Sequence, residues 1–451
     1  MKKILFLLFA LVISHATKAI EPSGTLPVVY ITTQNKTEIT STENYINATF
    51  YIDAKSSGYT SLGSATSQTA MKIRGRGQAS WTNYDKKPYR FKLTLGTQLL
   101  GMSKSKNYAL MAYADDMHAF LRASTGFKVS QLMNLAYTPN YRAVELVLNG
   151  DYKGLYFLTE TVRIDKDRVP IAKQDDNATD ANIITGGWLL EIDNVVDSEQ
   201  VTITEGNGNL ARFSYKDPEE LSTQQTNYLM GQLNGMDDAI YSSDKNSTVW
   251  QEYIDLDTLA RYYIVQEVMD NYKAFNGSTY LYKDRGETSN WNFGPVWDFG
   301  DAFMRDGQQF IYVNSPKTPQ IWIGEIVKYP AFQAKVRELW SDFYKNQYPK
   351  ISAHIDNFIT SIKSAAACDV QRWPAYGCSN PVAKATEFKA YLDARVKWLN
   401  EQWTNNNVEF IEINDNNPIE YYNLQGVKVD NPSNGIYIKV QNGKAEKTTI
   451  K

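Results

Sequence analysis

Two aspartates near the middle of the chain have the residue type and spacing that phosphoryl-transfer chemistry uses. Asp270 ends an apolar helical run, and Asp298 lies in the string Trp297-Asp298-Phe299-Gly300 after a hairpin-sized segment that contains Asn276. Enzymes of this class place one carboxylate near the acceptor hydroxyl and another on a metal ion bound to the phosphates. The two positions therefore suggest a catalytic carboxylate beside a metal-binding one.

The first 19 residues have the features of a secretory signal peptide. Lys2 and Lys3 precede the apolar run ILFLLFALVI, and small residues follow at 16–19. No later segment reaches the roughly 18 apolar residues that a membrane-spanning helix needs. We therefore expect 1–19 to be removed and the mature protein to be soluble outside the cytoplasm, either secreted or at the cell surface.

Charge and cysteine content argue against several classes of function. A net charge of -3, with the charges spread along the chain, gives no footprint for nucleic acid or an anionic membrane. Cys368 and Cys378 are the only cysteines and are expected to close a small disulfide-bonded loop in an oxidising compartment. Together with His118 and His354, they show neither zinc-ligand spacing nor a recognisable nucleophile motif.

Residue periodicity predicts a β-rich first half. Short stretches at 26–33, 47–54, 71–81 and 86–95 alternate with the period of a strand. A helical segment at 118–134 follows them, and Asn149-Gly150-Asp151 predicts a hairpin turn within 143–162. This half should be a mostly antiparallel sheet with one inserted helix.

The second half changes to a helical period. Amphipathic helices are predicted at 255–270, 330–346, 350–366 and 385–403, the first with Asp255 as its N-cap. Asparagine-rich stretches after Trp403 predict a linker, and alternation returns in the last 40 or so residues as a small β-module. The length favours a two-lobed α+β body with an appendage. We therefore divide the mature chain into a domain at 20–405 and a linker with a C-terminal β-module at 406–451.

Seven ordered motifs carry a resemblance to a known family. They are KIRGRGQASW, KKPYRFKL, LLGMSKSKNYALMA, FLRAS, VELVLNGDYKGLYFLTE, GGWLLEID and VWDFGDAF. In this order they resemble the CotH kinase family, named for a bacterial spore-coat protein, from about residue 27 to about 405. The C-terminal module resembles modules common on secreted proteins of Bacteroidetes, some of which serve as sorting signals.

The resemblance implies an atypical protein-kinase-like fold, with a β-rich N-lobe, a helical C-lobe and ATP-dependent phosphoryl transfer. It implies that Asp270 orients the acceptor hydroxyl and that Asp298 binds Mg²⁺ or Mn²⁺, like the aspartate of the kinase Asp-Phe-Gly element. Asn276 is a candidate second metal ligand, although it lies one residue further along than in protein kinases. Asp301 is the alternative for that role. An aspartate at a helix end is otherwise more often a hydrogen-bonding or solvated residue.

The nucleotide-binding residues are expected in the first half. A glycine-containing loop followed by Ser80 resembles a phosphate loop, because glycines let backbone amides approach phosphate oxygens; its residues are Arg74, Gly75, Arg76 and Gly77. The competing interpretation is a β-turn with exposed arginines. Either Lys92, slightly favoured, or Lys87 would grip the ATP phosphates. Glu160 falls where a hinge would meet the adenine, and Arg122 would pair with a carboxylate or phosphate.

Two functions from different classes remain open. The first is a secreted atypical protein kinase that transfers the ATP γ-phosphoryl group to hydroxyl side chains of a secreted or surface protein. The second is a catalytically silent kinase-like scaffold or binding module in a surface or polysaccharide-degrading assembly, because fold does not fix function. The high aromatic content would also suit glycan stacking. The presence of both Asp270 and Asp298 favours the kinase.

Overall fold

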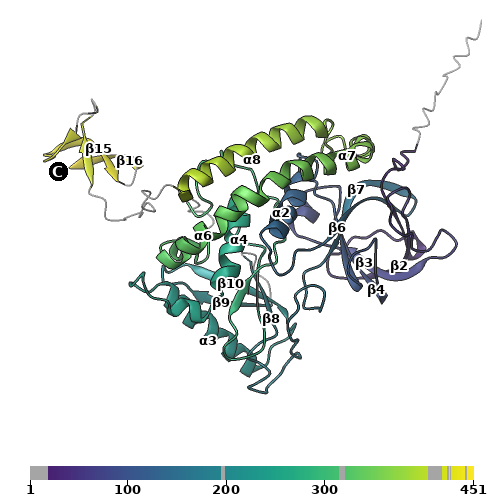
Figure 1. Cartoon of the computed structure of the whole chain (residues 1–451), viewed down its shortest axis with the longest axis horizontal. Coiled ribbons are helices and arrows are strands. Elements are labelled where there is room, and N and C mark those ends of the chain that lie inside the picture. The colour runs from purple at the N-terminus through teal and green to yellow at the C-terminus, as the bar shows by residue number, and fades with distance from the viewer. Residues whose placement is uncertain are drawn as a thin grey trace, which may run out of the picture.

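The computed structural model describes residues 19–193, 199–313, 320–404, 419–423, 426, 428–441 and 444–450. Residues 1–18 of the predicted signal peptide and most of the predicted linker lie outside these residues. Within them the chain is an α+β protein (Figure 1). No helix in the described part of the chain is long and apolar enough to cross a membrane.

The first half folds into a closed seven-stranded barrel with the strand order β1-β2-β3-β4-β5-β7-β6. Its members are β1 (Val28–Thr33), β2 (Ile46–Asp53), β3 (Thr69–Gly75), β4 (Tyr89–Thr97), β5 (Ser105–Met111), β6 (Tyr141–Leu148) and β7 (Asp151–Glu160). All neighbours pair antiparallel except β1 and β6, which pair in parallel and close the barrel. The mostly antiparallel sheet is confirmed, and its closure is an addition.

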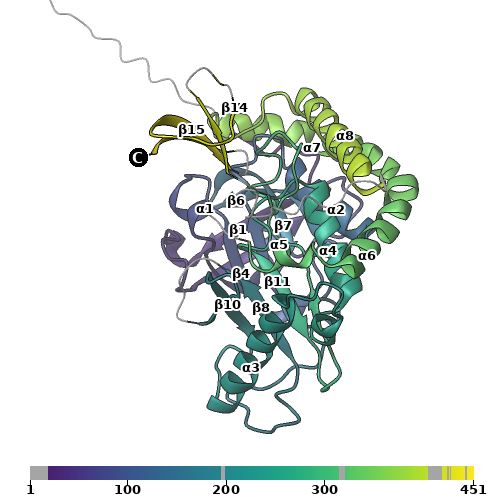
Figure 2. The same ribbon diagram turned by 90° about the vertical axis from the view of Figure 1, so that its left-hand side faces the viewer.

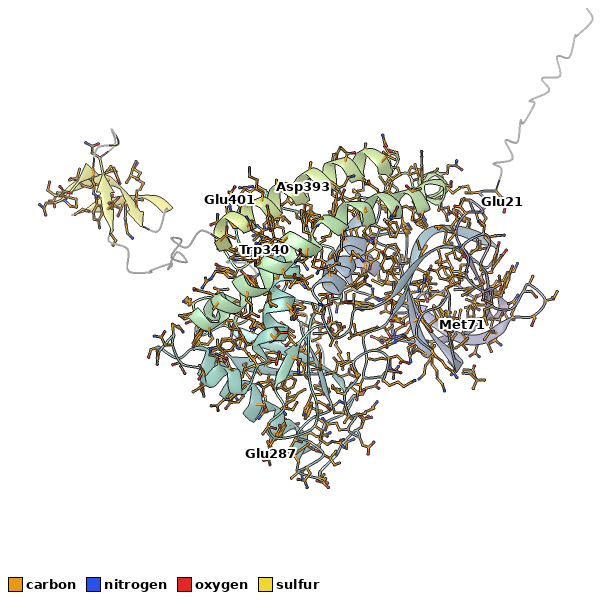
Figure 3. All side chains as sticks on the ribbon, in the orientation of Figure 1. Glu21, Met71, Glu287, Trp340, Asp393 and Glu401 are labelled. Atoms are coloured by element: carbon orange, nitrogen blue, oxygen red, sulfur yellow. The ribbon has the colours of Figure 1, made fainter. Side chains whose placement is uncertain are left out.

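Alternating side chains fill the barrel interior. Phe91 and Leu93 of β4 point inward and are buried, whereas Lys92 between them is exposed. Met71 of β3, labelled in Figure 3, belongs to the same interior cluster. The β6–β7 hairpin turns at Asn149 and Gly150, which have φ of 56° and 86°. Both residue types tolerate this conformation, so the predicted hairpin is confirmed.

A second sheet of five strands lies in the remainder of the body, in the order β12-β11-β8-β10-β9. The strands are β8 (Trp188–Ile192), β9 (Gln200–Thr204), β10 (Leu210–Asp217), β11 (Thr279–Lys283) and β12 (Trp291–Phe293). The second half is mainly helical as expected, because only β11 and β12 of this sheet lie after residue 255, but the sheet itself was not predicted. The central strand β8 is buried at every position, so it lacks the alternation that would have revealed it.

Helices and short helical turns accompany the two sheets among the described residues. They are α1 (Ala79–Thr82), α2 (Leu121–Leu132), α3 (Thr223–Ile240), α4 (Leu256–Val268), α5 (Ile323–Ile326), α6 (Pro330–Asp342), α7 (Pro349–Arg372) and α8 (Pro381–Thr404), with shorter helical turns η1 (Gln34–Lys36), η2 (Val249–Glu252) and η3 (Phe343–Gln347). Asp255 caps α4 as predicted, because its Oδ1 accepts a hydrogen bond from the Thr258 amide at 2.7 Å. Figure 2 shows α7 and α8 side by side, at the opposite end from α3.

The long C-terminal helices show the predicted amphipathic pattern. On α8, Leu392 and Leu399 are buried, whereas Asp393 and Glu401 are exposed. Trp340 of α6 is only 1% exposed and packs under α8 (Figure 3). The large core of the helices and the second sheet is separate from the cluster inside the barrel.

A small antiparallel sheet follows the predicted linker, in the order β14-β13-β15-β16. Its strands are β13 (Glu420–Tyr422), β14 (Lys428–Val429), β15 (Gly435–Gln441) and β16 (Lys444–Ile450). The expected C-terminal β-module is thus present among the described residues.

Cys368 and Cys378 are both partly buried free thiols, so the expected disulfide is not formed in this structure. The two thiols have different surroundings. Burial and the neighbouring Glu145 raise the pKa of Cys368 near the end of α7, whereas Cys378 lies near Lys384 of α8 and burial raises its pKa.

Candidate active site

Asp298 lies in the loop after β12 with its side chain exposed. Its Oδ1 accepts a hydrogen bond from the Gly300 amide at 2.9 Å, and its Oδ2 lies 3.5 Å from the Ser278 hydroxyl. No ion pair occupies this carboxylate within the described residues. The side chain is therefore held in place by its own turn but remains available to a ligand.

Helix α2 fixes the position of the Asp-Phe-Gly string. Phe299 is buried against Gly126, where a Cβ atom would lie 2.4 Å from the phenyl ring. Arg122, one turn earlier, donates a hydrogen bond from Nη1 to the Gly300 carbonyl at 2.5 Å and lies 3.7 Å from Asp116. The expectation that Arg122 pairs with a carboxylate is confirmed, and the contact ties α2 to the loop of Asp298.

Asp115 lies beside Asp298 and was not selected from the sequence. A Cβ atom on Gly300 would lie 2.9 Å from Asp115 Oδ2 and 3.2 Å from Asp298 Oδ1, so the two carboxylates approach the same point. Burial, with the charge of Asp298 as the next cause, raises the pKa of Asp115 to about 6. The only signal in the sequence is the Asp115-Asp116 pair that follows the strand motif KNYALMA.

Among the predicted nucleotide-binding residues, Arg76 contacts the residue next to Asp298 in the chain. It follows β3, its guanidinium lies 5.5 Å from the centre of the Trp297 ring, and its Nη1 is 2.9 Å from the Met111 sulfur. Burial lowers the pKa of Arg76, and the charge of Asp298 acts in the opposite direction. Within the described residues no carboxylate forms an ion pair with it, so its charge is available to an anion.

The other residues of the glycine-containing loop have local structural roles. The Arg74 guanidinium donates to the Thr42 carbonyl and lies 5.0 Å from the Tyr45 ring centre. A Cβ atom on Gly75 would lie 2.5 Å from the Trp81 ring. Gly77 has φ of +78° and contacts the Ser80 side chain, as a tight turn requires. Phosphate contact by these residues stays a prediction.

The two candidate lysines lie in different surroundings. Lys87 donates from Nζ to the Trp81 carbonyl at 2.6 Å and lies over the Trp81 ring. Lys92 is exposed on β4 opposite Lys72, on the outer face of the barrel. Neither lysine has a contact that links it to Asp298. Their role in gripping ATP also stays a prediction.

Glu160 is fully buried at the end of β7. Its carboxylate accepts hydrogen bonds from the Ser103 amide at 2.8 Å, the Tyr137 hydroxyl at 3.0 Å, and the Asn140 amide and side chain at 3.0 and 3.1 Å. All four donors hold the carboxylate in the fold, so only the backbone of Glu160 remains for the predicted contact with adenine.

Asp270 is also fully buried, which distinguishes it from Asp298. Its Oδ1 forms an ion pair with Arg305, and its Oδ2 accepts a hydrogen bond from the Tyr391 hydroxyl at 2.9 Å. Arg395 lies 3.9 Å from the same Oδ1. Both carboxylate oxygens are thus already bound, and an acceptor hydroxyl would have to displace one of these partners.

Arg395 of α8 joins Asp270 to the segment that follows Asp298. It forms a fully buried ion pair with Glu267 and donates to the carbonyls of Gly307 and Gln309 at 3.0 and 2.7 Å. Burial raises the pKa of Glu267, and Arg395 lowers it in part. The group therefore anchors residues 305–309 between α4 and α8.

The remaining predicted metal ligands precede and follow Asp298 in the chain. Asn276 is buried in the turn before β11, and Asp301 forms an ion pair with Lys273 at 2.8 Å. Both residues of that pair are partly exposed, so it contributes little to stability. No group of three or more His, Cys, Asp or Glu side chains is arranged for a metal ion within the described ranges.

Comparison with known protein families places most of the chain in one family. A family model described as CotH kinase protein matches residues 73–399, from the end of β3 to the last turns of α8. None of the curated proteins matches the chain. The matched range contains Arg76, Asp115, Asp270 and Asp298, and it covers most of the chain. The protein belongs to the CotH kinase family.

Proposed function

We propose that this protein is an atypical protein kinase that transfers the γ-phosphoryl group of ATP to a hydroxyl side chain of a secreted or surface protein. The observation that carries the proposal is the exposed carboxylate of Asp298, held between β12 and α2 beside Asp115, with the Arg76 guanidinium over the neighbouring Trp297 ring. Family membership supports kinase chemistry. Export rests on the signal-peptide features of residues 1–19.

The residues around Asp298 fit a magnesium ion that arrives with ATP. Mg²⁺ usually keeps several waters and is bound by one or two carboxylates together with substrate phosphates. Asp298 and Asp115 supply two carboxylates that approach one point, and burial, followed by the charge of Asp298, raises the pKa of Asp115. When bound, the ion neutralises charge on the phosphates. Mn²⁺ has similar oxygen ligands and fits the same description.

Residues of the chain would then position the nucleotide phosphates relative to Asp298. Arg76 would neutralise phosphate charge from the barrel side, and the turn at Gly77 would present backbone amides. Arg122 and Gly126 hold Asp298 through the Gly300 carbonyl and the Phe299 ring. Because phosphoryl transfer depends mainly on positioning and charge neutralisation, this rigidity is part of the proposed mechanism.

The contacts of Asp270 favour a positioning role in the observed conformation. With Arg305 and Tyr391 bound to its two oxygens, it holds the segment after Asp298 against α8. Its predicted role in orienting the acceptor hydroxyl would require Tyr391 or Arg305 to move away. Such a rearrangement would accompany binding of the protein substrate.

The same contacts support a second candidate function. A kinase-like protein whose hydroxyl-orienting carboxylate stays ion-paired would bind nucleotide without turnover and serve as a scaffold in a surface assembly. Incubation of the purified mature chain with ATP and Mg²⁺ or Mn²⁺ separates the two. Phosphate incorporation into the chain itself or into co-expressed secreted proteins supports the kinase, and nucleotide binding without any turnover supports the scaffold.

Replacing Asp298 tests the shared basis of both functions. We expect Asp298→Ala to abolish metal-dependent ATP binding in calorimetry while the fold persists, because it removes an exposed carboxylate. Asp238→Ala, which removes an exposed carboxylate of α3, is the matched control and should bind normally. Unchanged Mg-ATP affinity in Asp298→Ala would refute the assignment.

A further inference from the structure

A cavity of about 510 Å³ lies on the other side of α2 from the Asp-Phe-Gly string. It is enclosed by α2, α7, the start of β6 and the segments around residues 25–27 and 57–59. Its polar and charged lining residues include Ser124, Lys128, Asn140, Tyr141, Arg142 and His354. None of the lining residues is an aspartate or a glutamate. The volume is that of a small-molecule site.

Two positive charges in this cavity form no ion pair with an acidic side chain in the part of the chain that the structure describes. Lys128 of α2 forms no ion pair within the described residues and is only partly exposed. The Arg142 guanidinium is fixed by hydrogen bonds from Nε to the Leu100 carbonyl at 2.9 Å and from Nη1 to the Tyr141 carbonyl at 2.7 Å. It also lies 5.0 Å from the Tyr59 ring centre. A guanidinium held in this way is ready to bind an anion with little loss of side-chain entropy.

A buried polar network forms part of the wall. The Ser124 hydroxyl lies 2.8 Å from the Tyr141 hydroxyl and 2.9 Å from His354 Nε2. Burial, followed by the charge of Lys128, lowers the pKa of His354, so the imidazole is neutral at pH 7. The rings of Tyr141 and Phe358 add apolar surface beside these polar groups. The wall thus offers both hydrogen bonds and a surface for the carbon skeleton of a ligand.

We propose that this cavity is a binding site for a small organic anion whose phosphate or carboxylate group contacts Lys128 and Arg142 and whose ring packs against the aromatic wall. An anion there would compensate two charges that the fold leaves unpaired in a partly enclosed space. The site is separate from the one at Asp298, and its existence does not depend on kinase activity.

Helix α2 connects this cavity to the candidate active site, so a ligand in the cavity could affect that site through the helix. Ser124 and Lys128 face the cavity, whereas Arg122 and Gly126 of the same helix contact Gly300 and Phe299. A ligand that holds α2 therefore also affects the support of Asp298. This second step rests on the proposed function, because it requires nucleotide to bind at Asp298.

Calorimetry on the full mature chain at low salt tests the site with phenyl phosphate, benzoate and uncharged benzyl alcohol. We expect both anions to bind more tightly than the alcohol. Lys128→Met and Lys128→Glu should weaken the anions by roughly tenfold or more, as the loss of a charge-assisted contact predicts. Lys363→Glu, at an exposed position of α7, is the matched control and should bind like the wild type.

Three outcomes would overturn the proposal of an anion site. They are no binding of either anion, benzyl alcohol binding as tightly as the anions, or an unchanged affinity for the anions in both Lys128 variants. Asp298→Ala should retain benzoate binding, so failure of the nucleotide site is distinguishable from failure of this one. Benzoate should also change the Mg-ATP affinity of the wild type but not of Lys128→Met. An unchanged Mg-ATP affinity in the wild type would overturn the coupling through α2.

Discussion

Two acidic regions of the molecule differ in solvent exposure and in ion pairing. Asp298 and Asp115 are at least partly open to solvent, and neither forms an ion pair with a basic side chain among the described residues. Asp270 and Glu267 are fully buried and paired with Arg305 and Arg395. In the open region, formed by Asp298 and Asp115, the carboxylates are available to a ligand. In the closed region, formed by Asp270 and Glu267 with their arginines, the same residue type anchors the fold. What distinguishes them is which cations the fold brings to them.

Removal of Arg395 from the closed region should cause the largest loss of unfolding free energy. Arg395→Ala leaves Glu267 and Asp270 buried without their shared cation, a change that costs about 3–5 kcal/mol in comparable cases. Denaturant unfolding measures the loss. Lys397→Ala, exposed on the same helix, should stay within about 0.5 kcal/mol of the wild type. If the two variants lose equal stability, the buried ion pair is not an anchor.

Loss of one hydroxyl should weaken the closed region without affecting the open one. Tyr391→Phe removes the donor to Asp270 Oδ2 and to the Arg305 carbonyl, and hydrogen bonds to charged groups contribute about 1.5–3 kcal/mol. We expect reduced unfolding free energy with nearly unchanged Mg-ATP affinity in calorimetry. A large loss of nucleotide affinity would show that the two regions are not independent.

A methyl group on α2 should disturb the open region. In Gly126→Ala the new Cβ would collide with the Phe299 ring, and overpacking of this kind costs about 1–3 kcal/mol. Mg-ATP affinity should fall because a displacement of the Phe299 ring would also displace the adjacent Asp298. Gly231→Ala on α3, where a Cβ meets no atom within 4 Å, should instead stabilise by about 0.5–1 kcal/mol. Normal nucleotide binding in Gly126→Ala would show that α2 does not position Asp298.

The smallest expected effect is a pH dependence of the open region. The pKa of Asp115 is raised to about 6 in the folded protein, so protonation there favours the folded state. The stability that this proton contributes is complete below the unfolded pKa of about 4 and is lost as pH rises through 6. Relative to Asp115→Asn, the wild type should therefore become more stable as pH falls from 7 to 4.

Nucleotide binding should have the opposite pH dependence. Protonated Asp115 cannot bind a metal ion, so Mg-ATP affinity of the wild type should decrease below pH 6. Calorimetry across this range measures the decrease, and Asp115→Asn should lack it. Parallel pH profiles for the two proteins would show that Asp115 is not part of the site.

Short-range patterns explain why much of the fold could be predicted. Strands β2, β3 and β4 of the barrel alternate between an apolar interior and an outer face, and the Asn149-Gly150 turn fixes one hairpin. The second sheet was missed because β8 is buried on both faces and β12 has only three residues. Neither strand has an alternation long enough to be distinguished from a buried helix or a loop.

The candidate site was predictable only where one local string carries it. Trp297-Asp298-Phe299-Gly300 identified Asp298 directly, and the Arg-Gly-Arg-Gly loop identified Arg76. Asp115 could not be selected in this way, because its significance depends on its approach to Gly300. That approach joins the loop between β5 and α2 to the loop after β12, and the two loops are distant in the chain.

The sequence by itself determined the family motifs, the barrel strands, the long helices and the presence of both Asp270 and Asp298. Only the tertiary structure decided that Asp298 is open and Asp270 is closed. Tyr391 and Arg395, which bind or approach Asp270, lie on α8 and are far from it along the chain. The availability of a carboxylate depends on its burial and on its ionic partners, and both are set by long-range packing.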